Sequence, residues 1–172
     1  MQEACAADAV IEICKRPGDF GLPGEALARI RSRKEIDDEI KGRVEGCFSW
    51  GNERTPNQDV LFPVRQLLEI IGCALSPGIN NQYTALLCID QLGRGTCEML
   101  ARAVPDPFRL DPQGDVRIIA EPVDHETFME AVWGPLEQYA RDDGIASAHV
   151  SKTLGRLERL PELCQCGRST GT

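Results

Sequence analysis

Polar residues that could hold an anion gather in two neighbouring stretches of the sequence, residues 54–66 and 76–84. Arginine carries a planar guanidinium that fits carboxylate or phosphate oxygens, and serine, asparagine and threonine can add hydrogen bonds. These residue types at this spacing predict a site for a small anionic ligand. The candidate residues are Arg54, Asp59, Arg65, Gln66, Ser76, Asn80 and Thr84.

The same residues also have a purely structural interpretation. Arg54 and Asp59 could pair near a helix start, Ser76 and Asn80 could cap a loop, and Arg65 could bond Glu69. Antiparallel helices would place that loop at the far end of the first helix, so we do not expect one pocket to hold all seven in one subunit. Arg65 and Gln66, in the middle of the helix, could reach toward either end of it or across an interface between two subunits.

Enzyme chemistry has weaker support in the sequence. No nucleophile elbow, phosphate-binding loop or dinucleotide fingerprint is present. His125 follows Asp124 at a predicted helix start, a position typical of an exposed histidine, and His149 has no predicted carboxylate partner. We therefore predict no catalytic residue and a non-enzymatic protein, with an enzyme possible only if chains assemble a site between them.

The cysteines predict neither a metal site nor a cofactor site. Structural zinc sites use Cys-x-x-Cys pairs or Cys/His clusters, and neither pattern occurs among the eight cysteines. Cys88 falls on an apolar helix face and Cys97 at its edge, where thiols act as small apolar groups. Without an export signal at the start of the sequence, we expect free thiols in a reducing compartment.

The composition predicts a globular protein without nucleic acid as a partner. Its 172 residues contain 19 Lys and Arg against 27 Asp and Glu, a net charge of −8, which does not suit a phosphate backbone. No apolar stretch approaches the ~20 residues that span a bilayer, so the chain itself is expected to be soluble. We predict a single domain over residues 1–163 and a flexible tail over residues 164–172.

Residue patterns predict a helix-rich α+β fold. A β-branched run and a glycine- and proline-rich return predict a small β-unit over residues 9–31, and residues 36–44 form a charged helical stretch. A long antiparallel helix pair covers residues 55–104, and a β-hairpin covers 108–120. Two C-terminal helices cover 124–160, the first capped at Asp124 and the second beginning at Asp142-Asp143.

The predicted helix pair has several marked features. Thr55 and Pro56 are a helix cap and first residue, and Pro63 should bend the first helix near Asp59. Residues 76–81 break the chain before the second helix, over residues 82–103. On that helix, charges alternate in sign at four-residue steps and face water or a partner subunit. This ladder consists of Asp90, Arg94, Glu98 and Arg102.

Several motifs resemble an uncharacterised bacterial family of predicted inner-membrane proteins, whose members carry membrane spans followed by a soluble domain. The matching segments are Arg54-Thr55-Pro56-Asn57-Gln58-Asp59, Arg65-Gln66-Leu67, Ala74-Leu75-Ser76-Pro77-Gly78-Ile79-Asn80, Thr84-Ala85 and Asp90-Gln91-Leu92-Gly93. The likeness covers residues 9–160. This chain has Asn81-Gln82 where the family has Asp-Pro, which removes a carboxylate, and Pro63 where the family has a small or branched residue.

The resemblance implies a domain on the cytoplasmic side of the inner membrane, tethered there through spans that this sequence lacks, and it brings no assigned activity. Because catalytic motifs are also absent, we predict a regulatory or assembly domain. The chain is then either an excised domain or a short relative. Apolar residues within the polar half of the first helix, Phe62 and Cys73, hint at burial by a second subunit. We therefore expect a homo-oligomer formed through the helices, and a sensor of small anions is the alternative.

Overall fold

The computed structural model describes residues 1–51 and 56–159. These residues form six helices and one four-stranded mixed sheet, which confirms the predicted α+β class. The chain makes two compact units: a sheet unit of residues 1–59 and 104–122, and a helix bundle of residues 60–103 and those from 123 onwards. A single domain over residues 1–163 stays a prediction, and the predicted tail lies outside the described residues.

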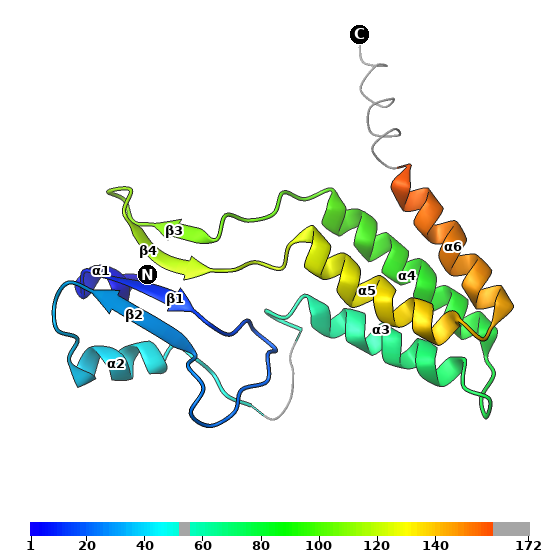
Figure 1. The fold of residues 1–172 in the computed structure, drawn as a ribbon, viewed down its shortest axis with the longest axis horizontal. Helices are drawn as coiled ribbons and strands as arrows, with labels where there is room; N and C mark the ends of the chain where they lie inside the picture. The colour runs from blue at the N-terminus through cyan, green and yellow to red at the C-terminus, as the bar shows by residue number, and fades with distance from the viewer. Residues whose placement is uncertain (52–55, 160–172) are drawn as a thin grey trace, which may run out of the picture. The chain divides into compact units, whose positions relative to one another are not determined.

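The sheet unit contains both predicted β elements (Figure 1). The strands lie in the order β2-β1-β4-β3, where β1 is antiparallel to β2 and parallel to β4, and β3 and β4 form the predicted hairpin. Sequence analysis had not joined the β-unit and the hairpin into one sheet. The strand bounds are β1 Ala9–Ile13, β2 Ala28–Ser32, β3 Phe108–Leu110 and β4 Val116–Ala120.

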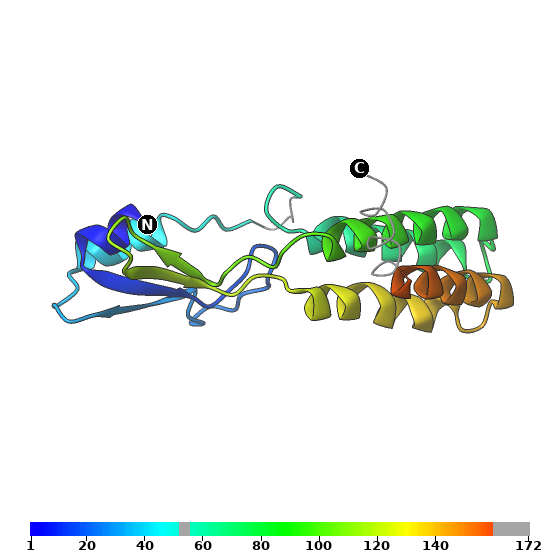
Figure 2. The ribbon, with the colours of Figure 1, turned by 90° about the horizontal axis from the view of Figure 1, so that it is seen from above.

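Two short helices, α1 (Gln2–Ala6) and α2 (Asp38–Glu45), cover one face of this sheet (Figure 2). Asp37 caps α2 by accepting a hydrogen bond from the Ile40 amide at 2.8 Å. The apolar cluster beneath them is small, because only three of its side chains are buried: Ala4, Ile11 and Val44. Five partly buried side chains complete it, namely Ile13, Ala28, Ile30, Ile40 and Phe48.

The helix bundle contains four helices in two layers, α3 with α4 and α5 with α6 (Figure 2). Its core is much larger than that of the sheet unit, and Ile71, Ile89, Val132 and Leu136 are fully buried in it. Apolar residues at three- and four-residue spacing place these side chains on the inner faces. The bounds are α3 Leu61–Ala74, α4 Gln82–Leu100, α5 His125–Ala140 and α6 Gly144–Glu158.

Most predicted helix ends are confirmed. Asp124 accepts from the Thr127 amide at 2.7 Å, and Asp143 accepts from the Ile145 and Ala146 amides at 3.0 and 2.8 Å. These carboxylates satisfy backbone donors that a helix start leaves unpaired. Pro135 lies inside α5.

The start of the first long helix was predicted wrongly. The helix begins at Leu61, and residues 56–58 form a turn, while Thr55 lies outside the described residues. Asp59 is buried in the sheet unit, packed so closely on Gly18 that a Cβ there would lie 2.0 Å from its Oδ2. We attribute the late start to this burial. The prediction of a bend near Asp59 was therefore also wrong. Pro63 falls in the first helical turn, where backbone amides have no intrahelical acceptor, so the missing amide of proline costs no helical hydrogen bond.

Candidate functional site

The corner between α3 and α4 holds three of the predicted site residues. Ser76 Oγ donates to the Cys73 carbonyl at 2.7 Å, and the amide of Asn80, whose φ is +45°, donates to the Ser76 carbonyl at 2.9 Å. Asn81 caps α4 by accepting from the Thr84 amide at 3.2 Å. These bonds satisfy polar groups of the corner locally, which favours the structural interpretation of Ser76 and Asn80.

The other predicted site residues lie elsewhere. Arg65 and Gln66 are exposed on α3, and Arg65 precedes the end of the helix at Ala74 by about 14 Å at 1.5 Å per residue. Asp59 belongs to the sheet unit, and Arg54 lies outside the described residues. Within the bundle, the structure therefore does not gather the arginine with the corner, and an anion site stays a prediction.

Three residues of the charge ladder, Asp90, Arg94 and Glu98, lie on the exposed face of α4, as their spacing predicted. Arg102 is exposed two residues beyond Leu100, where the helix ends three residues earlier than predicted. Arg94 Nε lies 3.1 Å from Glu98 Oε1 within the helix. Asp90 Oδ1 lies 2.8 Å from Nε2 of His149 on α6. Sequence analysis missed this partner for His149, because the contact depends on how α6 packs against α4 and no local pattern records it.

A shallow apolar groove of about 240 Å³ runs between α3 and α4 beside this ladder. Val60, Pro63 and Leu67 line one side, and Gly95 and Met99 line the other. Val60 remains 45% exposed although it is apolar. An exposed apolar groove next to alternating charges has the composition of a protein interface more than that of a reactive centre.

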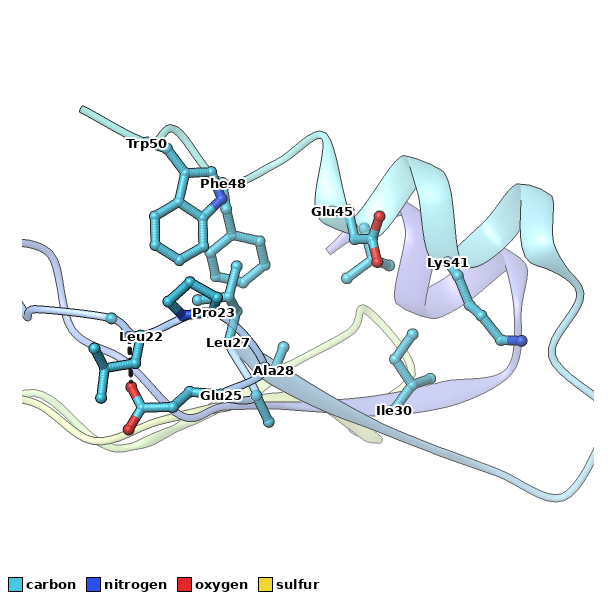
Figure 3. Close-up of a pocket in the computed structure, with 14 residues that line it drawn as sticks. Leu22, Pro23, Glu25, Leu27, Ala28, Ile30, Lys41, Glu45, Phe48 and Trp50 are labelled. Atoms are coloured by element: carbon cyan, nitrogen blue, oxygen red, sulfur yellow. Dashed lines mark hydrogen bonds between the residues drawn. The ribbon is translucent and has the colours of Figure 1, made fainter. Parts of the chain in front are cut away.

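The sheet unit contains a larger pocket, of about 700 Å³, which the sequence had not indicated. Its walls are the loop 21–27, strand β2, helix α2 and the aromatic rings of Phe48 and Trp50 (Figure 3). Glu25 fixes the loop by accepting from the Leu22 amide at 2.9 Å and pairing with Lys15 at 2.8 Å. The sequence offered one indication of this pocket, namely the two aromatic residues Phe48 and Trp50 within a loop that contains glycine and serine.

An ion cluster holds the β3–β4 turn to the start of β1. Arg117 donates to Asp111 Oδ2 at 2.7 Å and to Asp8 Oδ1 at 2.9 Å. The guanidinium lowers the pKa of both carboxyl groups below their usual range. Asp111 also accepts from two amides of its own turn, so this cluster holds the β3–β4 turn in place.

The described residues do not bring several metal-ligating side chains together in one place. No group of three His, Cys, Asp or Glu side chains is close enough there to hold a metal ion. Cys88 lies buried in the bundle core, as its helix position predicted, and burial raises the pKa of its thiol. A raised pKa keeps the unreactive protonated form.

Comparison with known proteins identifies relatives without an assigned activity. Residues 1–156 match the model of a family described as "Predicted membrane protein (DUF2254)". Uncharacterized protein Rv1290c of Mycobacterium tuberculosis (strain ATCC 25618 / H37Rv) and Uncharacterized protein Mb1321c of Mycobacterium bovis are each 39% identical to the chain over 66 residues. That alignment covers 38% of this chain and 13% of each relative.

No solved structure matches the chain. Among the described residues, no helix has the length and apolar character needed to cross a bilayer. The family model nevertheless covers both the sheet unit and the helix bundle almost to the end of α6. The chain therefore belongs to this family of predicted membrane proteins.

Proposed function

We propose that this chain is a non-enzymatic assembly domain of a membrane protein, which self-associates through the outer face of α3 and α4 on the cytoplasmic side of the membrane. Family membership supports the link to a membrane protein. Free thiols at exposed Cys5, Cys47 and Cys73 suit a reducing compartment, which supports the cytoplasmic side.

The charge pattern of α4 is the observation that carries this proposal. A two-fold axis that passes beside the outer face of α4, at the level of Thr96 along the helix, would set a second copy of the helix antiparallel to the first. Arg94 would then lie opposite the partner's Glu98, and Asp90 would face the partner's Arg102, which follows the end of the helix by two residues. Each charged side chain of the ladder would face a side chain of opposite charge, so the faces of two copies would be electrostatically complementary.

The groove beside the ladder supplies apolar surface for the same contact. Outside the groove, Ile70 of α3 and Leu87 of α4 are further apolar side chains that remain 44% and 47% exposed. A Cβ built at Gly95 would have no neighbour within 4 Å, so a second backbone has room to approach there. Burying this surface against another copy would remove apolar area from water and favour association.

Sedimentation equilibrium of the full chain tests the proposal by charge reversal. Arg94→Glu and Glu98→Arg each place like charges across the proposed seam, so both single variants should dissociate at least tenfold more readily than the parent chain. The double variant restores opposite charges and should recover most of the association. Circular dichroism of each variant controls for loss of helix.

Two results would contradict assembly through this face. The parent chain could remain a monomer at high micromolar concentration. Alternatively, the double variant could dissociate as readily as the single variants, which would show that the charges do not meet across a seam.

A further inference from the structure

Strand β2 forms an edge of the sheet, with no described strand on its outer side. The Cys14 amide donates to the Leu27 carbonyl at 2.8 Å, so the backbone groups of Leu27 face β1. Backbone groups alternate in direction along a strand, which turns those of Ala28 and Ile30 away from β1. The outer edge of β2 therefore presents hydrogen-bonding groups at these two residues.

The large pocket lies directly beside this edge. The side chains of Ala28 and Ile30 line it from the strand (Figure 3). Val44 lines it from α2. Phe48 and the 66% exposed Trp50 line it near the start of the strand. An apolar side chain on a segment paired to β2 would enter this pocket from the same side as Ile30.

The opposite side of β2 is cationic. Arg29 and Arg31 point to the face away from the pocket, and their side chains remain 61% and 69% exposed. Both share one carboxylate, that of Glu12, at 3.7 and 2.7 Å. One carboxylate neutralises only one of the two guanidinium groups, so an acidic neighbour on this face would be attracted.

We infer that β2 binds an extended peptide segment in which apolar and acidic residues alternate. The segment adds a fifth strand to the sheet, with its backbone bonded to Ala28 and Ile30, its apolar side chains in the pocket and its carboxylates beside Arg29 and Arg31. This site goes beyond the proposed assembly function and does not depend on it.

A second copy of β2 fits this edge poorly. Antiparallel pairing of two β2 strands about Ile30 would set Arg29 directly opposite the partner's Arg31. Like charges directly opposite each other destabilise a strand pair. Charge complementarity therefore selects an acidic segment as the occupant.

The test measures fluorescence anisotropy of a labelled ten-residue peptide of alternating valine and glutamate, titrated with the full chain. A peptide of the same composition in irregular order tests the need for alternation. A peptide of alternating valine and lysine tests the need for acidic groups. We expect the alternating acidic peptide to bind at least tenfold more tightly than either control.

Two variants locate the site. Ala28→Pro removes one outward amide donor, which an edge strand tolerates at its first residue, and Ala28→Ser keeps that donor. Arg31→Glu reverses one charge at the edge, and Lys152→Glu makes the same change in charge on exposed α6. We expect at least tenfold weaker binding for Ala28→Pro and Arg31→Glu, and parent-like binding for Ala28→Ser and Lys152→Glu.

The inference is overturned if the alternating acidic peptide binds no better than its controls, or if Ala28→Pro and Arg31→Glu bind it like the parent chain. It is also overturned in favour of a second copy if Ala28→Pro abolishes self-association in sedimentation. Circular dichroism confirms that each variant retains its fold, and Arg31→Glu should in addition gain affinity for the valine–lysine peptide.

Discussion

The helix bundle and the sheet unit hold themselves together by different means. The bundle buries a continuous apolar core across α3, α4, α5 and α6. The sheet unit buries only three side chains of its apolar cluster and adds ion pairs around Arg117 and Glu12. We conclude that the bundle is stabilised mainly by its apolar core, whereas the sheet unit depends more on polar contacts. The sheet unit also has an unpaired strand edge and a pocket among its described residues.

The two cores should respond unequally to the same truncation. Ile89→Ala in the fully buried bundle core should lower the free energy of unfolding by about 3–4 kcal/mol, because neighbours cannot close the cavity. Ile11→Ala in the sheet unit should cost at least about 1 kcal/mol less, because the half-exposed neighbours can relax. Urea unfolding curves measure both, and equal losses would remove the contrast between the cores.

Two glycines of α4 sharpen the comparison within the bundle. A Cβ at Gly93 would lie 2.6 Å from Thr153 Cγ2 of α6, so Gly93→Ala should destabilise the chain by about 1–3 kcal/mol through overpacking. Gly95 faces open space, so Gly95→Ala should stabilise the helix by about 0.5–1 kcal/mol. Thermal unfolding compares the two variants, and a stabilised Gly93→Ala would show that α4 and α6 are packed differently.

Acid should weaken the sheet unit through its ion cluster. Arg117 lowers the pKa of Asp111 below the ordinary value of 3.8, so the folded state binds its proton less readily than the unfolded chain. This contribution is complete above about pH 4 and is lost as the pH falls through the lowered pKa. Backbone amide exchange of β3 and β4, followed from pH 5 to pH 2.5, measures this loss of stability. In Asp111→Asn, which has no carboxylate to protonate, the stability should fall less over this range. An unchanged acid profile in Asp111→Asn would exclude the carboxylate as its source.

Local patterns predicted the elements whose causes are local. The caps at Asp124 and Asp143, the helix pair around residues 76–81 and the hairpin all depend on residues within a few positions of one another. The start of α3 was missed, because the burial of Asp59 against Gly18 is a long-range contact. The parallel pairing of β1 with β4 was missed for the same reason, since about a hundred residues separate the strands.

The site was predicted less well than the fold, and the reason is again distance along the chain. Ser76, Asn80 and Thr84 lie together because they are close in sequence, whereas Arg65 lies far along α3 from them. The pocket beside β2 combines a loop, a strand, a helix and two aromatic residues. No single segment contains enough of it to produce a recognisable motif.

Oxidative cross-linking tests assembly through α3 and α4 most directly. Cysteine replaces Gly95 near the proposed axis, or Gly134 on α5, where a Cβ likewise has no neighbour within 4 Å. The exposed native cysteines and the two in the C-terminal tail are changed to serine in both variants. We predict a covalent dimer from Gly95→Cys and a monomer from Gly134→Cys, whereas equal cross-linking at the two positions, or none at Gly95→Cys, would contradict the account.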